Sequence, residues 1–320
     1  METTATVPRS VDELQDTLAA RGYIADRGLA VSVYLALRLK RPLFLEGEAG
    51  VGKTEVGKVL AAALDTELIR LQCYEGLDVS HAVYEWNYPR QLLEIRLLEA
   101  SEGLKRVEAT RHLFTHEFLI RRPLLRAIEG TRARPPVLLI DEIDRADEEF
   151  EGYLLELLSD FQITIPELGT IRAEEPPIVI ITSNRTREVH DALKRRCLYW
   201  WIEYPDFDKE YRIVTAKVPA AGARLAAQVT AFVQELRTLD LYKAAGLSET
   251  LDWAAALVAL NREALDADVV EQTLGILLKN QEDIESVRGT RLPALLARAL
   301  AQAAARSEPG AGPTPSNTVP

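Results

Sequence analysis

The feature that most constrains this chain is a glycine-rich stretch that follows a short apolar run and precedes a helical pattern. Its residues fit G-x-x-x-x-G-K-[S/T] and are Gly47, Glu48, Ala49, Gly50, Val51, Gly52, Lys53 and Thr54. The apolar run Leu43–Leu45 is typical of a buried strand, and 54–64 has helical spacing. A glycine-rich turn of purely structural use is the alternative. The position between strand and helix favours a phosphate-binding loop.

The chemistry of such a loop requires these residue types. Glycines let successive backbone N–H groups turn toward one phosphate chain, and the next helix directs its positive N-terminus at the same anion. Lys53 can then reach the β- and γ-phosphates, and the Thr54 hydroxyl can bind Mg²⁺. The motif therefore predicts a site for ATP with Mg²⁺.

Four further apolar runs alternate with helical patterns along the chain. The strands are predicted at 67–72, 137–140, 178–181 and 198–202, and the main helices at 27–40, 148–160 and 190–196. The runs are apolar on both faces, which is typical of a mostly parallel sheet covered by helices on both sides. The predicted fold class is α/β with five strands.

The predicted domain organisation has four parts. A helix capped by Ser10 lies in 1–24, and an α/β nucleotide-binding domain spans 25–205. That domain carries an insertion around 74–130, with a helix near 91–100, and a hairpin around 163–177. After Pro205 only helical patterns follow, so 206–305 is predicted to be a helical lid domain, with helices at 208–218, 222–239, 250–260, 266–279 and 282–303. The proline- and glycine-rich end, 306–320, is predicted to be disordered.

Polar residues at the ends of two predicted strands supply the next candidates. Asp141 and Glu142 follow the strand 137–140, and Asn184 follows the strand 178–181. Asp141 is expected to hold the Mg²⁺ shell, Glu142 to activate the attacking water, and Asn184 to contact the γ-phosphate. Helix capping and turn formation are the structural alternatives for these residue types.

A basic cluster ends the predicted helix 190–196. Arg195 and Arg196 could simply complement the helix dipole. In a ring of subunits, one of them could instead reach the ATP of a neighbour and stabilise the charge of the transition state. Arg196 is slightly preferred for that role.

Composition excludes several classes of protein. Lys plus Arg is 38 and Asp plus Glu is 49, so the formal charge is −11, which makes nucleic acid an unexpected partner. No apolar run approaches the roughly 20 residues that a bilayer requires, and the first residues lack a secretion-signal core, so a cytoplasmic location is expected. Cys73 and Cys197 form no disulfide framework, and no zinc-site spacing occurs.

The motifs GEAGVGKT, LLIDEIDRA, IITSN and ALKRR, followed by helices, resemble those of AAA+ ATPases. The stretch 141–146 (DEIDRA) and the hairpin near Leu168 resemble the MoxR family. The segment 76–82, together with 84–92 (YEWNYPRQL), resembles the CoxD-like branch encoded beside carbon monoxide dehydrogenase.

This resemblance implies a phosphate-loop core with a helical lid, assembled into a ring that usually has six subunits, with ATP at the subunit interfaces. It also implies a chaperone of metalloenzyme maturation, working with a partner that carries a von Willebrand factor A domain. For this branch the implied client is a molybdenum hydroxylase such as carbon monoxide dehydrogenase, whose metal centre would be matured.

One departure from the family pattern stands in the lid. Family members carry an arginine in a Gly-x-Ser-x-Arg stretch, whereas this chain has threonine at position 250 of the run 246–250. Candidate replacements are Arg262, Arg288 and Arg291. Two other functions stay open: an AAA+ motor or loader that acts on nucleic acid, and a nucleotide-dependent scaffold that does not hydrolyse ATP.

Overall fold

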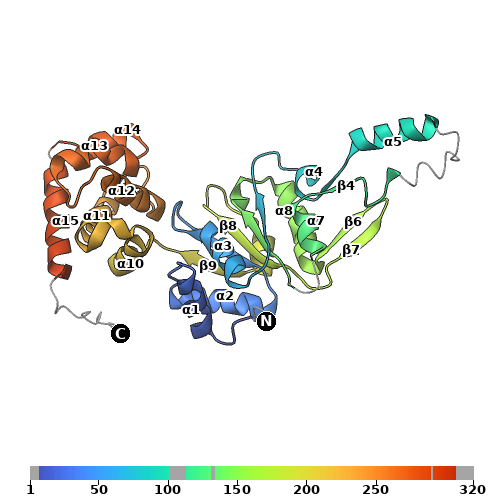
Figure 1. Ribbon diagram of the computed structural model, residues 1–320, viewed down its shortest axis with the longest axis horizontal. Helices are drawn as coiled ribbons and strands as arrows, with labels where there is room; N and C mark the ends of the chain where they lie inside the picture. The colour runs from blue at the N-terminus through green and yellow to red at the C-terminus, as the bar shows by residue number, and fades with distance from the viewer. Residues whose placement is uncertain (1–6, 101–112, 131–133, 290, 308–320) are drawn as a thin grey trace. The chain divides into compact units, whose positions relative to one another are not determined.

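A computed structural model describes residues 7–100, 113–130, 134–289 and 291–307 (Figure 1). The chain divides into two compact units. Residues 1–47 and 53–202 make the first unit, and residues 48–52 and 203–320 make the second.

The first unit is built on a five-stranded parallel sheet with the strand order β2-β5-β8-β1-β9. The strands are β1 (Leu43–Gly47), β2 (Leu68–Gln72), β5 (Val137–Asp141), β8 (Ile178–Ser183) and β9 (Leu198–Ile202). The three central strands are almost wholly buried, as expected when helices cover both faces. The predicted α/β fold class with a five-stranded parallel sheet is confirmed.

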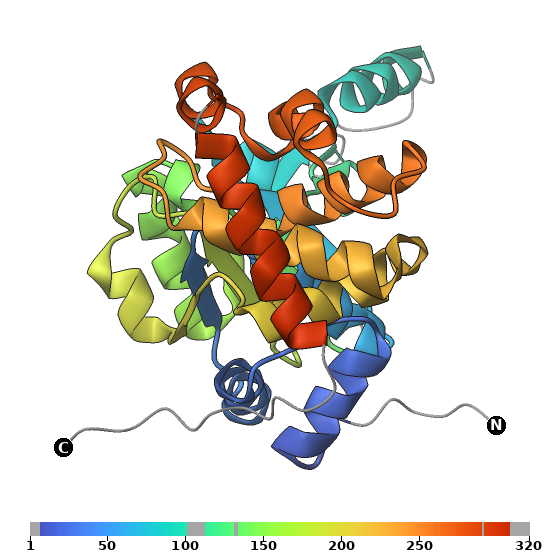
Figure 2. The same ribbon diagram turned by 90° about the vertical axis from the view of Figure 1, so that its left-hand side faces the viewer.

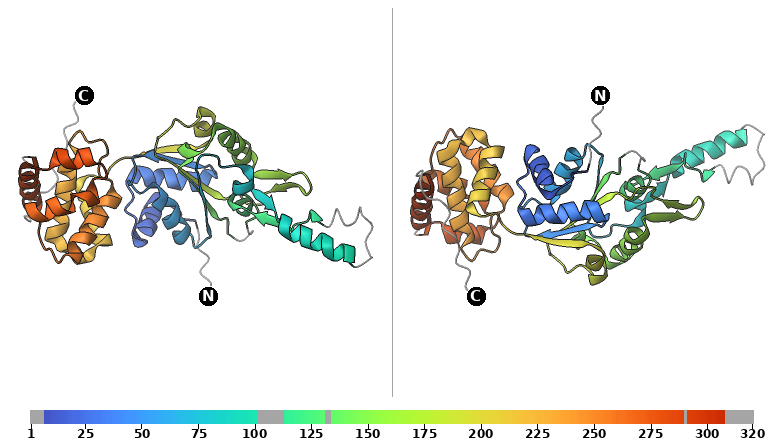
Figure 3. Two further views of the ribbon diagram at one scale, coloured as in Figure 1. Left: turned by 90° about the horizontal axis from the view of Figure 1, so that it is seen from above. Right: turned by 90° about the horizontal axis from the view of Figure 1, so that it is seen from below.

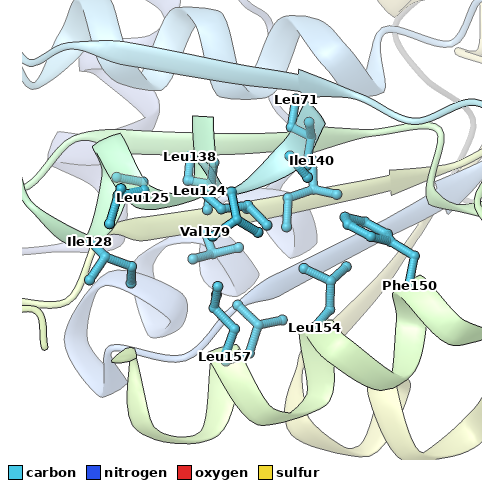
Figure 4. Close-up of a cluster of buried hydrophobic side chains, with 14 of the residues drawn as sticks. Leu71, Leu124, Leu125, Ile128, Leu138, Ile140, Phe150, Leu154, Leu157 and Val179 are labelled. Carbon is cyan, nitrogen blue, oxygen red and sulfur yellow. The ribbon is translucent and has the colours of Figure 1, made fainter. Parts of the chain in front are cut away.

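Helices flank this sheet (Figure 1). They are α1 (Val11–Ala20), α2 (Arg27–Leu39), α3 (Lys53–Ala63), α7 (Pro123–Ile128), α8 (Glu148–Asp160) and α9 (Asp191–Arg196). As predicted, the Ser10 side chain caps α1, where it accepts a hydrogen bond from the backbone N–H of Glu13. On one face, apolar side chains from α7 and α8 pack against β2, β5 and β8 (Figure 4). Leu138 and Leu154 in this layer are fully buried.

The register of the strands sets up the site. Gln72 of β2 lies beside Asp141 of β5, and Glu46 of β1 lies beside Ser183 of β8. The carboxyl ends of four strands therefore meet at one edge of the sheet, which is where open α/β sheets bind ligands.

The segment between β2 and β5 forms its own small substructure. It contains α4 (Val79–Ala82), β3 (Tyr84–Trp86), α5 (Tyr88–Ala100) and β4 (Leu119–Arg121), and β3 pairs antiparallel with β4. Trp86 is buried and meets the Phe114 ring edge-on at 5.2 Å, whereas Tyr88 is exposed. Helix α5 and the hairpin of β6 (Gln162–Ile165) and β7 (Gly169–Arg172) extend from the same side of the first unit (Figure 3).

The second unit is helical. Its helices are α10 (Phe207–Lys217), α11 (Gly222–Arg237), α12 (Leu247–Ala259), α13 (Ala267–Leu277), α14 (Gln281–Val287) and α15 (Arg291–Ser307). In Figure 2, α15 runs across α11, and both contribute to a core in which Trp253 and Phe232 are fully buried.

Two expectations about this unit are wrong in detail. The continuous helix predicted at 282–303 is two helices, because the first ends at Val287 and Gly289 takes the left-handed conformation at φ +72°. Helix α15 extends into the predicted disordered tail as far as Ser307, and the rest of 306–320 lies outside the described residues. None of the helices described is both long and apolar enough to cross a bilayer.

Candidate active site

The glycine-rich turn leads from β1 into α3, as its motif predicts. Gly50 and Gly52 have φ of +78° and +93°, a backbone that side chains rarely adopt and that the glycines allow. Lys53 is only 5% exposed, and its ammonium group donates a hydrogen bond of 2.8 Å to the carbonyl of Gly47. The lysine is therefore anchored at the start of the turn, with Thr54 next to it in the first turn of α3.

Asp141 is the buried acid at the end of β5, with 2% exposure. Its Oδ1 accepts hydrogen bonds from the hydroxyls of Thr54 at 2.8 Å and Thr182 at 2.6 Å. Its Oδ2 accepts from Nη2 of Arg70 at 2.5 Å and from Nε at 3.1 Å. Because each oxygen is held by donors from other elements, the carboxylate has a fixed orientation.

These residues fit a magnesium ion. Mg²⁺ prefers hard oxygen ligands and usually takes one or two carboxylates, with phosphates and waters completing its shell. The Thr54 hydroxyl donates to Asp141, which leaves its oxygen lone pairs available to a cation. No cluster of three or more potential ligands among His, Cys, Asp and Glu occurs in the described part of the chain.

Glu142 follows directly and is partly exposed, with 30% of its side chain accessible. Its Oε2 accepts from Nε2 of Gln72 at 3.0 Å and forms an ion pair with Nε of Arg145 at 3.0 Å, and its Oε1 accepts from Nδ2 of Asn184 at 3.2 Å. Its backbone is left-handed at φ +56°. A left-handed non-glycine residue costs about 1–3 kcal/mol and persists only where surrounding contacts hold it, as they do here.

The structure brings four of the predicted residues together at the carboxyl edge of the sheet. Thr54 contacts Asp141, Glu142 follows Asp141 in the chain, and Asn184 contacts Glu142. The hydroxyl of Thr182 joins the two acids, since it donates to Asp141 and accepts from the backbone N–H of Glu142 at 2.9 Å.

Arg195 and Arg196 lie away from this cluster. They end α9 just before Leu198, which pairs with Leu43 at the opposite end of β1 from Gly47. A five-residue strand rises roughly 13 Å between its first and last residues. The two arginines therefore lie near the amino ends of the strands, whereas Asp141 and its neighbours lie at the carboxyl ends.

The two arginines differ in their contacts. Arg196 donates from Nε to the hydroxyl of Ser159 at 2.9 Å and from Nη1 to the carbonyl of Ala192 at 3.1 Å. Arg195 is exposed, and its side chain makes no hydrogen bond or ion pair within the ranges that the structure describes.

Sequence reasoning assigned no role to three residues of the site: Arg70, Gln72 and Thr182. Arg70 and Gln72 lie on the predicted strand 67–72, and Thr182 directly follows the predicted strand 178–181. A polar residue at the end of an apolar strand indicates such a position, but this pattern does not show which strand neighbours β5.

Cys73 is a free cysteine buried in the core of the first unit. Burial, reinforced by the nearby charge of Asp141, raises the pKa of the Cys73 thiol to about 12. A thiol with such a pKa stays protonated at neutral pH, which disfavours a nucleophilic role.

The position of the missing lid arginine is occupied by a buried residue of the second unit. The Thr250 hydroxyl donates to Oε1 of Glu210 at 2.7 Å. Arg237 binds the same carboxylate through two hydrogen bonds of 2.7 and 2.8 Å. Of the candidate replacements, Arg262 pairs with Asp266 on the surface of the second unit at 3.7 Å, and Arg288 and Arg291 flank the break between α14 and α15.

Comparison with known families agrees with this architecture. The family model of the AAA domain (dynein-related subfamily) matches residues 42–197, which hold strands β1, β2, β5 and β8 and the acidic cluster. Strand β9 and residues 203–320 of the second unit lie outside that match.

Comparison with individual proteins gives distant relatives. An uncharacterized protein of Staphylococcus haemolyticus is 24% identical over 230 residues, which are 70% of this chain and 78% of that one. The chaperone protein ClpB of Bacillus cereus is 29% identical over 171 residues, 52% of this chain but only 16% of ClpB. A solved structure from Cytophaga hutchinsonii has a TM-score of 0.48 at 14% identity, covering 92% of this chain and 94% of that one. The AAA match supports ATPase activity in general terms.

Proposed function

We propose that this chain hydrolyses ATP to ADP and phosphate, and that it uses the reaction to remodel a bound client protein. The observation that carries the proposal is the hydrogen-bonded cluster of Thr54, Asp141, Glu142 and Asn184 at the sheet edge that follows the phosphate-binding motif. An acid with a fixed orientation beside a partly exposed acid suits metal binding and water activation, respectively.

Each residue has a distinct task in this proposal. Lys53 exchanges its bond to the Gly47 carbonyl for contacts with the β- and γ-phosphates, and the N–H groups of the turn hold the same phosphates. Glu142 accepts the proton of the attacking water. Asn184 orients Glu142 through its amide and contacts the γ-phosphate.

Thr54 and Asp141 would hold Mg²⁺ in this proposal, and the metal would supply positive charge against the charge that develops on the phosphate oxygens. Arg70 binds the Oδ2 atom of Asp141 and places its positive charge beside that oxygen.

One arginine of α9 acts on the ATP of a neighbouring subunit in a ring, which we propose to be hexameric. The location of Arg195 and Arg196 near the amino ends of the strands supports action in trans, because neither lies near the acids of its own chain. The contacts of Arg196 with Ser159 and Ala192 favour Arg195 as the acting residue.

The proposed client is a metalloenzyme, a molybdenum hydroxylase such as carbon monoxide dehydrogenase, whose metal centre is matured. A partner with a von Willebrand factor A domain is proposed to link chaperone and client. The resemblance of 84–92 to the CoxD-like branch of MoxR ATPases supports this choice. The ClpB similarity supports only the more general chaperone role.

The hydrolysis proposal is tested by steady-state ATPase assays across a range of protein concentrations. Specific activity should rise as subunits associate, and Lys53→Ala should abolish ATP binding and turnover. No turnover at any concentration would favour a nucleotide-dependent scaffold. Stimulation by nucleic acid that is lost steeply with added salt would favour a motor on nucleic acid.

The shared site is tested by mixing inactive variants. Lys53→Ala subunits should regain activity when mixed with the double variant Arg195→Ala/Arg196→Ala, since each then supplies what the other lacks. Mixing with each single arginine variant identifies the acting residue. Assembled mixtures that stay inactive would rule out the shared site.

The client is tested by affinity purification of Glu142→Gln in the presence of ATP. Enrichment of molybdenum hydroxylase subunits relative to Lys53→Ala supports the maturation role. Enrichment of unrelated proteins only would contradict it.

A further inference from the structure

A second buried acid lies close to the cluster of Thr54, Asp141, Glu142 and Asn184. It belongs to the 3₁₀ turn Ile143–Arg145, which follows β5. Asp144 is 3% exposed. Its Oδ1 accepts from the backbone N–H of Asn184 at 3.1 Å, and its Oδ2 accepts from the backbone N–H of Thr186 at 2.9 Å and its hydroxyl at 2.6 Å. All three donors belong to the segment that carries Asn184.

The residue between these two backbone donors has a strained conformation. Arg185 has a left-handed backbone at φ +57°. Such a residue needs surrounding contacts that hold it. Asp144 bonds to the residue on each side of Arg185, and the hydroxyl of Ser183 accepts from the Arg185 N–H at 3.0 Å. The acid therefore stabilises the turn that sets the direction of the Asn184 side chain.

These contacts close a ring that includes the proposed water-activating residue. Starting at Glu142, the chain leads through two peptide bonds to Asp144, whose carboxylate binds the Asn184 backbone. The Asn184 amide then donates back to Glu142. A ring of this kind fixes Glu142 and Asn184 relative to each other more tightly than their single 3.2 Å bond could.

The ionisation of Asp144 suits this task. Burial opposes the charge, but the hydrogen bonds from Thr186 and Asn184 outweigh burial and lower the pKa of the Asp144 carboxyl. At neutral pH the group is a carboxylate that only accepts hydrogen bonds, as its three donors require.

We infer that Asp144 is a positioning residue for the proposed hydrolysis: it holds the Asn184 turn so that the Asn184 amide meets Glu142. This inference rests on the proposed function. It adds a residue that would not touch ATP or metal and would act only through Asn184.

The test compares Asp144→Asn, Asn184→Ala and the double variant in the full chain. Asparagine has one acceptor oxygen and presents an NH₂ group to donors, so at least one backbone bond is lost. We expect kcat to fall about ten- to a hundredfold, with ATP affinity changed less than about threefold. The double variant should be no slower than Asn184→Ala alone, because the two residues act as a unit.

Two further variants keep the test independent of folding. Thr186→Val removes only the hydroxyl donor and should lower kcat by about two- to threefold. Asp283→Asn is the matched control, since Asp283 is 5% exposed and accepts two backbone N–H groups, from Tyr242 and Lys243, inside the lid. It should leave kcat unchanged.

A readout without ATP separates this inference from the proposed function. Amide hydrogen exchange of residues 184–186 should quicken at least tenfold in Asp144→Asn and stay unchanged in Asp283→Asn. Unchanged exchange there, or strictly additive losses of kcat, would overturn the inference. An unsubstituted chain without turnover, but with the expected change in exchange, would reject the hydrolysis while supporting the positioning of the turn.

Discussion

The two units each contain a buried ionic network, and the networks differ in what they leave available. In the second unit, Glu210 is fully buried, and each of its oxygens accepts two hydrogen bonds of 2.6–2.8 Å, from Arg237, Gln234 and Thr250. In the first unit, Glu142 is partly exposed and has bonds of 3.0–3.2 Å.

This difference separates a carboxylate that stabilises the fold from one that is available for a reaction. The Glu210 carboxylate is fully buried, and both of its oxygens are held by donors of its own unit, so it stabilises that unit. A partly exposed carboxylate with longer bonds can exchange a protein donor for water. Buried charge alone therefore does not mark a candidate site, and the partial exposure of its side chain distinguishes Glu142 from Glu210.

The largest effect is expected in the second unit, where Glu210 is fully buried. Arg237→Met removes the partner of Glu210 and leaves its charge buried, which should lower the free energy of unfolding by about 3–5 kcal/mol. Urea unfolding followed by circular dichroism measures the change. The control Arg298→Met breaks an exposed pair with Glu235 and should cost at most about 1 kcal/mol. Equal costs for the two variants would remove the distinction between the networks.

Substitution of Glu142 in the first unit should instead reduce activity and change stability little. Glu142→Gln should reduce turnover at least about a hundredfold while ATP binding is retained, because the amide cannot accept the proton of water. Its free energy of unfolding should change by less than about 1 kcal/mol, since the side chain is partly exposed. Normal turnover in this variant would exclude Glu142 from the mechanism.

A smaller effect tests the donor on β2. Gln72→Leu removes one hydrogen bond to Glu142 and should lower kcat by about two- to tenfold, the usual worth of one such bond. Gln281→Leu is the control, because it removes a similar amide-to-carboxylate bond, to Glu285, on the lid surface. A kcat that is equally affected in both variants would contradict a specific role for Gln72.

The smallest effect concerns Asp78, whose side chain is 61% exposed, and it extends the comparison to a carboxylate at the surface. Asp78 caps α4, and its hydrogen bonds from the His81 and Ser80 side chains and the His81 N–H lower the pKa of the carboxyl from 3.8 to about 2. Because the folded pKa lies below the unfolded value, the contribution of Asp78 to stability is complete above pH 3.8 and disappears as the pH falls through 2.

Nuclear magnetic resonance of the Asp78 carboxyl carbon measures this titration directly. A midpoint close to 2 is expected in the intact chain. In His81→Ala, which loses the side-chain donor that contributes most, the midpoint should move toward 3.8. A midpoint of 3.8 in the intact chain would mean that water replaces these bonds.

Local sequence patterns were sufficient to predict most of the helices and strands. Helix α8 and strand β9 have the predicted bounds, because their apolar spacing and their flanking polar residues agree. The break between α14 and α15 was missed, since a helical pattern continues across Gly289 and only its left-handed backbone reveals the turn. The outline of the site followed from the same reasoning, because polar residues that end parallel strands share one edge.

The sequence by itself determined the parallel sheet, the phosphate-binding turn and the acids at the strand ends, since these depend on spacing between near neighbours in the chain. Only the tertiary structure decided that Gln72 meets Glu142, that Asp144 holds the Asn184 turn, and that Arg195 lies near the amino ends of the strands. Those contacts join residues many positions apart, and strand order and register set them. No local periodicity encodes which strands become neighbours.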